Sequence, residues 1–140
     1  MAEEDLRDAV AKLDSTRAQL DGFIKQSDFL RMSLEEHMRA KETIARYNET
    51  KKGERLLVPI GANCFIFAAV EDKEEVIVGL GSDVAIKDTA EGAISKLDKR
   101  IKQISDAEEE LAKRIAELDS EVSILTQQVQ TEYEKYRSRG

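Results

Sequence analysis

A heptad repeat over the C-terminal part of the chain limits the possible folds more than any other sequence feature. Two series of positions alternate with spacings of three and four residues: Ile94, Ile101, Glu108, Ile115, Val122, Val129, Tyr136, and Leu97, Ile104, Leu111, Leu118, Leu125, Glu132. Eleven of these thirteen sites are apolar, which is the pattern of a coiled-coil helix that packs one apolar stripe against a partner. We therefore expect a helix over residues 88–137, roughly 75 Å long at about 1.5 Å per residue.

The start of this helix is predicted from capping residues. Asp88 is a favourable N-cap, because its carboxylate can accept hydrogen bonds from free backbone N–H groups. Glu91 stands three residues later, where it would complete a capping box with Asp88.

A second long helix is predicted over residues 5–50, which contain no proline and a single glycine. Its apolar residues begin at heptad spacing as Leu6, Val10, Leu13, Leu20 and Ile24. Further along, a spacing of seven links different positions: Phe23, Leu30, His37, Ile44, and Leu20, Ser27, Leu34, Lys41. Such a change of register is a stutter, which alters the supercoil locally without ending the helix.

The middle segment, residues 53–87, has another character, because it holds four of the seven glycines and the only proline. Short runs rich in β-branched and aromatic residues alternate with turn sequences, which predicts four strands in two successive hairpins. We expect turns at 61–63, 71–74 and 81–83. The strand residues expected to mediate oligomerisation are Leu57, Val58, Ile60, Phe65, Ile66, Phe67, Val76, Ile77, Val78, Val84 and Ile86.

Together these elements predict a single α+β domain over residues 1–140. Two helices of similar length flank the strands, so they can return beside each other as an antiparallel coiled-coil hairpin with both chain termini at the open end. The strands carry apolar residues at nearly consecutive positions, which indicates burial on both faces. One chain cannot cover both faces and would leave strand edges free. We therefore expect hairpins from several chains to close into an intersubunit β barrel.

This plan resembles the prefoldin α subunits, which have a helix, two β hairpins and a second helix. The resemblance covers essentially the whole chain. Its most specific parts are residues 57–62, Leu-Val-Pro-Ile-Gly-Ala, and residues 75–86, which correspond to the first strand with its turn and to the second hairpin. Ala85 and Lys87 depart from the aromatic residue and Glu that the family often has there.

The resemblance implies an archaeal-type hetero-hexamer of two α and four β subunits (α2β4), with a β-barrel base and six coiled-coil arms. It implies a chaperone that captures unfolded polypeptides between the arm tips without ATP and passes them to a group II chaperonin. A structural coiled-coil scaffold without chaperone activity is the alternative.

Several classes of function are not supported by the sequence. Acidic residues outnumber basic ones in each of the segments 1–50, 51–87 and 88–140, and the net charge is −7. A nucleic-acid-binding surface is therefore not expected. No apolar stretch is long enough for a membrane span, and the first residues lack the features of a secretory signal. The single cysteine, Cys64, fits a reducing cytosol, so we expect a cytoplasmic protein.

Catalytic, cofactor and metal sites are not predicted either. Gly79-Leu80-Gly81 is interpreted as part of a hairpin turn and not as a phosphate loop. His37 has no nearby second ligand, and Cys64 is interpreted as a small, buried hydrophobic residue. Glu108 falls on the helix seam, where a polar residue can set the register or permit local opening.

The arm tips are the candidate site for unfolded protein. Frayed helix ends open at low free-energy cost and would expose apolar residues on an otherwise charged arm. The alternative is that these residues only close the coiled coil. The candidates are Leu6, Val10, Leu13, Val129, Tyr133 and Tyr136. Tyr133 lies off the predicted seam, so it is the favoured contact for an unfolded client.

Overall fold

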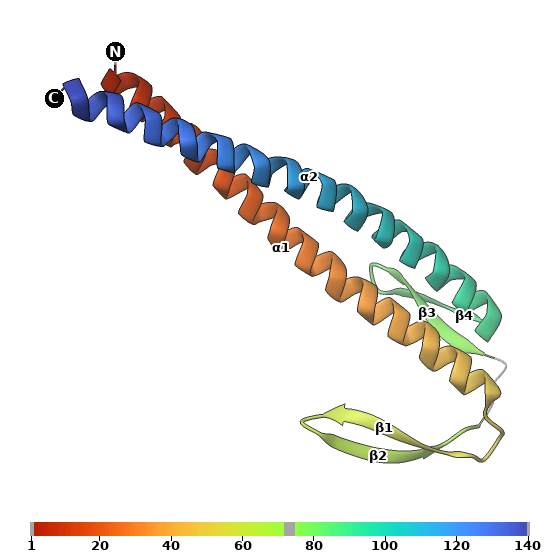
Figure 1. Cartoon of the computed structure of the whole chain (residues 1–140). Helices are drawn as coiled ribbons and strands as arrows, with labels where there is room; N and C mark the ends of the chain where they lie inside the picture. Colours follow the sequence, from red (N-terminus) through yellow and green to blue (C-terminus); the bar gives the residue numbers. More distant parts are fainter. Residues whose placement is uncertain (1, 72–74, 140) are drawn as a thin grey trace. The chain divides into compact units, whose positions relative to one another are not determined.

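A computed structural model describes residues 2–71 and 75–139 and contains two helices and two β hairpins (Figure 1). In chain order the elements are α1 (Ala2–Glu49), β1 (Arg55–Gly61), β2 (Cys64–Ala69), β3 (Val76–Gly81), β4 (Val84–Asp88) and α2 (Ala90–Arg139). The predicted fold class, two long helices with two small β hairpins between them, is confirmed. The turn expected at 71–74 includes residues 72–74, which lie outside the described residues.

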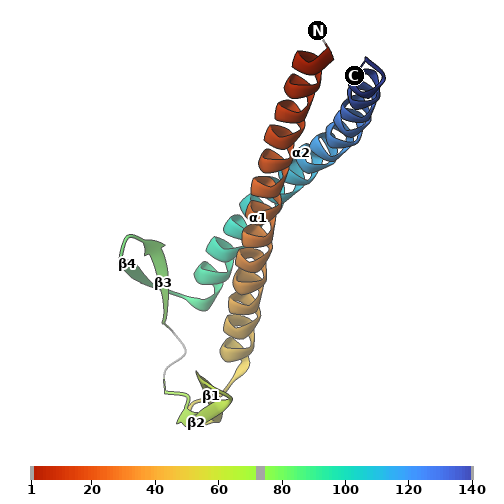
Figure 2. The same cartoon turned by 90° about the vertical axis from the view of Figure 1, so that its left-hand side faces the viewer.

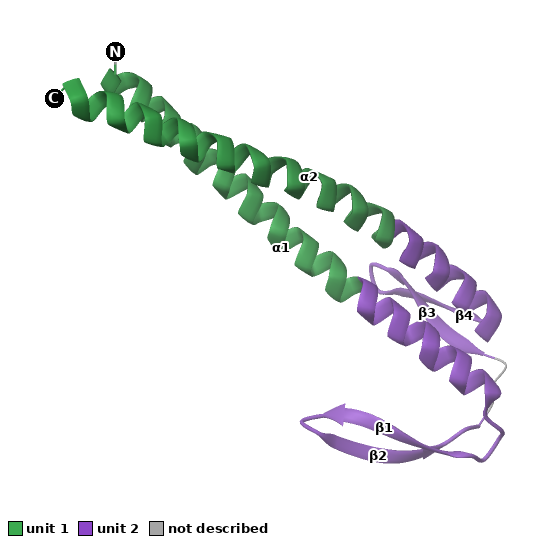
Figure 3. Ribbon diagram, in the orientation of Figure 1, with its two compact units in different colours: residues 1–33, 104–140 green, residues 34–103 purple. Residues whose placement is uncertain are grey.

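The chain divides into two compact units (Figure 3). The first joins residues 1–33 with residues 104–140, and the second comprises residues 34–103. The helices therefore contribute one part to each unit, whereas both hairpins belong to the second.

In the first unit, the beginning of α1 and the end of α2 run antiparallel, and both chain ends lie at the same end of the pair (Figure 2). Leu111, Leu118 and Leu125 of α2 are buried. All three belong to the leucine-rich series of the heptad repeat. Every other site of the repeat on α2 is buried or half-buried, except Tyr136, so the predicted seam of this helix is confirmed.

The stutter predicted in α1 is wrong. Burial follows one uninterrupted heptad pattern: Leu6, Ala9, Leu13, Thr16, Leu20, Phe23, Ser27 and Leu30 in the first unit, then Leu34, His37, Lys41 and Ile44 in the second. Ala9 takes the seam position that the prediction gave to Val10, and Thr16 takes a seam position at which no apolar residue was predicted. Thr16 can be buried because its hydroxyl donates to the carbonyl oxygen of Lys12 at 2.9 Å.

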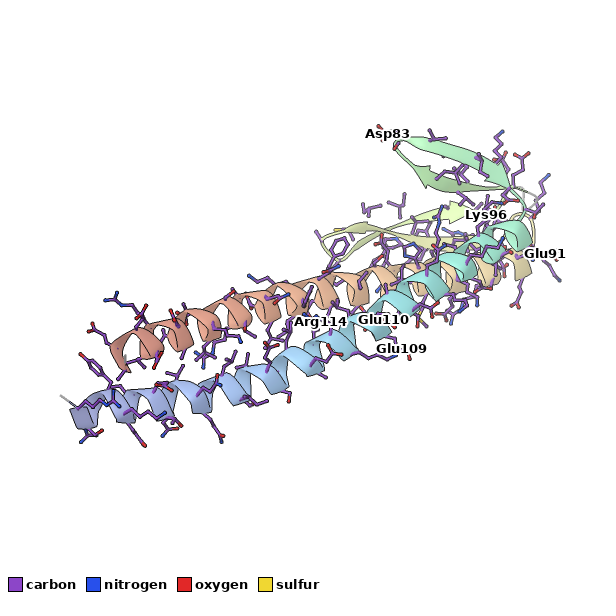
Figure 4. All side chains as sticks on the ribbon, turned by 90° about the horizontal axis from the view of Figure 1, so that it is seen from above. Asp83, Glu91, Lys96, Glu109, Glu110 and Arg114 are labelled. Carbon is purple, nitrogen blue, oxygen red and sulfur yellow. The ribbon has the colours of Figure 1, made fainter. Side chains whose placement is uncertain are left out.

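In the second unit, both hairpins have the same turn geometry. β1 pairs antiparallel with β2, and β3 with β4. In each turn a glycine with positive φ, Gly61 or Gly81, precedes two further residues with positive φ. These pairs are Ala62-Asn63 and Ser82-Asp83, and the conformation is that of a type I′ hairpin turn. The predicted turns at 61–63 and 81–83 are confirmed. Asp83, labelled in Figure 4, lies in the turn that joins β3 and β4.

The start of α2 differs from the predicted capping box. Asp88 is the last residue of β4, and the helix begins at Ala90. The side-chain oxygen of Thr89 accepts a hydrogen bond from the N–H of Gly92 at 3.0 Å, so Thr89 is the N-cap. Asp88 instead accepts a hydrogen bond from the N–H of Thr89 at 2.8 Å and one from the Lys96 ammonium group.

Candidate functional site

A groove at the open end of the first unit brings together part of the predicted arm-tip site. It has a volume of about 490 Å³ and is lined by Glu3, Leu6, Arg7, Val10, Ala11 and Asp14 of α1 and by Tyr136 of α2. The α1 residues recur at spacings of three and four, which place them on one helix face. Leu6, Val10, Ala11 and Tyr136 supply the apolar part of the groove, called the floor here, and Glu3, Arg7 and Asp14 supply the charged part, called the walls.

The six predicted tip residues divide into three groups. Leu6, Val10 and Tyr136 line the groove, and Val10 and Tyr136 are 38% and 44% exposed. Leu13 is buried in the seam and could contact a ligand only if the helices part there. Val129 is half-buried, whereas Tyr133 is exposed but does not line the groove.

Sequence reasoning missed the charged walls of this groove. Arg7 forms an ion pair with Glu3 at 3.7 Å. The Asp14 carboxylate has no hydrogen-bond or ion-pair partner among the described residues. The signal that could have found Asp14 is its position four residues after Val10, on the same side of the helix.

The hairpins of the second unit form another candidate surface. In β1–β2, apolar side chains are exposed on both faces of the two-stranded sheet. Leu57 pairs with Phe67 on one face and Val58 pairs with Ile66 on the other, and all four are at least 36% exposed. The Arg55 guanidinium lies over the Phe67 ring, 4.5 Å from its centroid.

The hairpin β3–β4 buries part of one face within its own unit. Val78 is 6% exposed, and its cross-strand partner Ile86 is half-buried. The Arg100 guanidinium of α2 donates a hydrogen bond to the carbonyl oxygen of Gly79 at 2.5 Å. On the opposite face Ile77 is 73% exposed.

Of the remaining strand candidates, Ile60, Phe65 and Val84 are exposed and Val76 is half-buried. Exposed apolar surface of this kind makes the hairpins a candidate interaction surface.

The structure shows where His37, Glu108 and Cys64 lie, none of which was predicted to form a catalytic or metal site. His37 lies half-buried on the α1 seam. The Glu108 carboxylate is 3.8 Å from the Arg31 guanidinium, which links α2 to α1 in the first unit. The predicted burial of Cys64 is wrong, because this residue is exposed at the start of β2. Its thiol donates to the carbonyl oxygen of Ala62 at 3.5 Å. No group of three or more metal-ligating side chains occurs within residues 2–71 and 75–139.

Neither helix in the described part of the chain is long and apolar enough to cross a membrane.

Comparison with known proteins adds evidence of ancestry. A family model described as "Prefoldin subunit" matches residues 16–135. The chain belongs to the prefoldin family. Prefoldin is a chaperone family, so the chain has the role of a chaperone subunit.

The most informative prefoldin relatives are α subunits from archaea. The prefoldin subunit alpha of Methanopyrus kandleri is 32% identical over 113 residues, which cover 81% of this chain and 72% of the relative. The prefoldin subunit alpha 1 of Methanocaldococcus jannaschii is 28% identical, with 94% and 90% covered. The predicted resemblance to prefoldin α subunits is confirmed.

Two solved prefoldin structures share the fold. Filamentous prefoldin from Methanocaldococcus jannaschii matches with a TM-score of 0.52 and 24% identity, covering 89% of this chain and 97% of that chain. The prefoldin β subunit from Thermococcus strain KS-1 matches with a TM-score of 0.60 and 17% identity, covering 90% of each chain.

Proposed function

We propose that this prefoldin subunit is part of an ATP-independent cytoplasmic chaperone that captures unfolded polypeptides and passes them to a group II chaperonin. Its partners would be prefoldin β subunits in a hetero-hexamer of two α and four β subunits. The observation that carries the proposal is the groove to which Leu6 and Val10 of α1 and Tyr136 of α2 contribute at the open end of the first unit. An accessible apolar groove offers an unfolded chain a place to bury its own apolar side chains.

The exposed strands support the assembly part of the proposal. Both faces of β1–β2 expose apolar side chains in the isolated chain, and each hairpin sheet has only two strands. Two-stranded sheets of this size are marginal alone and gain stability from further strands. Partner hairpins would cover these faces and pair with the free strand edges.

The experiment compares the assembly containing the unmodified subunit with one in which Leu6, Val10 and Tyr136 are each changed to Ser. Mass measurement of the native complex should show the same hexamer, because the substitutions lie far along the chain from every strand. Suppression of aggregation of an unfolded client should fall, because each large apolar contact contributes on the order of 1–3 kcal/mol. The loss should be partial, since the partners would carry four of the six arms.

The matched control is Ile124→Ser, which removes an apolar side chain that is 60% exposed on α2 but does not line the groove. It should leave protection unchanged. Equal protection by the groove variant and the unmodified assembly would favour a coiled-coil scaffold in which the tip residues only close the helix pair.

A further inference from the structure

We propose that the tip groove selects unfolded segments in which a large apolar side chain lies close to a Lys or Arg. This inference rests on the proposed function and specifies the chemistry of the client segment. It arises from the juxtaposition of an apolar floor and an unpartnered carboxylate in one groove.

The floor accounts for the apolar half of this preference. Val10 and Tyr136 approach from different helices, and Leu6 lies one turn before Val10. A volume of about 490 Å³ falls within the range of roughly 300–1,000 Å³ typical of ligand pockets. The groove is therefore large enough for one or two apolar side chains of an extended segment, and too small for a folded domain.

The walls account for the basic half. Arg7 forms an exposed ion pair with Glu3 at 3.7 Å, so these two residues together add no net charge to the groove. Asp14 lies one turn beyond Val10 and lacks a partner among the described residues. A client Lys or Arg beside a seated apolar side chain would reach this carboxylate, whereas a client Asp or Glu would be repelled by it.

The expected discrimination is modest for each arm. Exposed ion pairs correspond to a change in affinity of about two- to fivefold, and the effect should weaken as added salt screens the charges. Several arms that hold one chain would multiply the preference through avidity.

The test uses the subunit assembled with prefoldin β subunits and three labelled peptides. These share one apolar core and differ only in flanking Lys, Gln or Glu residues. Fluorescence anisotropy at low and high salt should give the order Lys, Gln, Glu in decreasing affinity, with the differences shrinking at high salt. Asp14→Asn should reduce the Lys-over-Gln preference about two- to fivefold.

Asp8→Asn is the matched control, because Asp8 is an exposed acid of the same helix that does not line the groove. It changes the net charge by the same amount and should leave the preference intact. Equal effects of the two substitutions, or equal binding of the three peptides, would overturn this inference while leaving client capture in place.

Two other outcomes would reject the groove as a client site. If none of the peptides binds, the proposed function fails together with the preference. The groove could instead bind the arm tips of a second assembly. In that case the mass of the assembly will double, and Val10→Ser will abolish the doubling. The groove would then be a contact between assemblies and not a client site.

Discussion

Lys96, two turns into α2, donates a hydrogen bond from its ammonium group to the Asp88 carboxylate at the end of β4. Asp88 also accepts the backbone N–H of Thr89 at 2.8 Å. One carboxylate thus links the second hairpin to the first turns of the helix that follows it.

Asp88→Asn should destabilise the subunit at neutral pH and lose its effect in acid. The hydrogen bond from Lys96, followed by that from Thr89, lowers the pKa of Asp88 below its ordinary value of 3.8. A lowered folded-state pKa means that Asp88 contributes stability above pH 3.8, and that this contribution is lost as pH falls through the folded-state pKa. Urea unfolding at pH 7 and in acid would measure the difference.

Lys96→Gln is the control for this pair, and it should reproduce most of the loss at neutral pH. Combining both substitutions should add little to either one, because they remove the same interaction. Full additivity would show that Asp88 and Lys96 act independently.

Thr89→Ala should lower the free energy of unfolding by about 1 kcal/mol, the usual effect of removing an N-cap side chain. The Thr89 side chain accepts the N–H of Gly92, which would otherwise have no intrahelical partner. Thr89→Ser keeps this acceptor and should be close to neutral. If Thr89→Ala leaves the free energy of unfolding unchanged, Asp88 and not Thr89 is the functional N-cap.

Ile66→Lys should dissociate the assembly while leaving the fold of the chain intact. Ile66 is 50% exposed in the isolated chain, so a charge there is harmless until a partner covers it. Burying an unpaired charge then costs several kcal/mol. Native mass spectrometry would report assembly, and circular dichroism would report the fold.

Two companion variants sharpen this test. Ile124→Lys places the same charge at a similarly exposed site on α2 and should assemble normally. Val78→Lys should damage the chain as well as the assembly, because Val78 is already buried within its own unit. An intact hexamer with Ile66→Lys would place this strand face outside the interface.

Glu108→Leu should raise the stability of the helix pair by about 1–2 kcal/mol through added apolar burial. Glu108 occupies a heptad site with 26% of its side chain exposed. Arg31, its ion-pair partner, would still have the Asp28 carboxylate at 3.9 Å after the substitution. Glu109→Leu, on the exposed side of the helix, should not be stabilising. A loss of stability in Glu108→Leu would show that the ion pair with Arg31 outweighs apolar packing.

Nucleotide should have no effect on client protection. Gly79 and Gly81 belong to β3, and Gly81 enters the hairpin turn with a φ of 97°, so this segment has no following helix to hold a phosphate. Isothermal titration with ATP and magnesium should therefore give no heat of binding. A micromolar nucleotide site would contradict the proposed energy-independent mechanism.

The sequence by itself determined the α2 seam and the two hairpin turns, because both depend on local spacing. Leucine recurs at every seventh residue from Leu111 to Leu125, and only one helix face can bury such a series. Gly61 and Gly81 stand where the backbone requires positive φ, a conformation that glycine adopts without steric cost. These signals need no knowledge of the partner element.

Only the tertiary structure decided the seam of α1, the cap of α2 and the walls of the tip groove. Ala9 and Thr16 are too small or too polar to indicate burial in a sequence, yet they lie on the seam because the opposing helix determines which face is covered. Asp88 was the predicted cap, but its carboxylate accepts a hydrogen bond from Lys96, and Thr89 caps the helix instead. Asp14 of α1 became a candidate binding group because it lines the same groove as Tyr136 of α2, and only packing between distant segments forms such a groove.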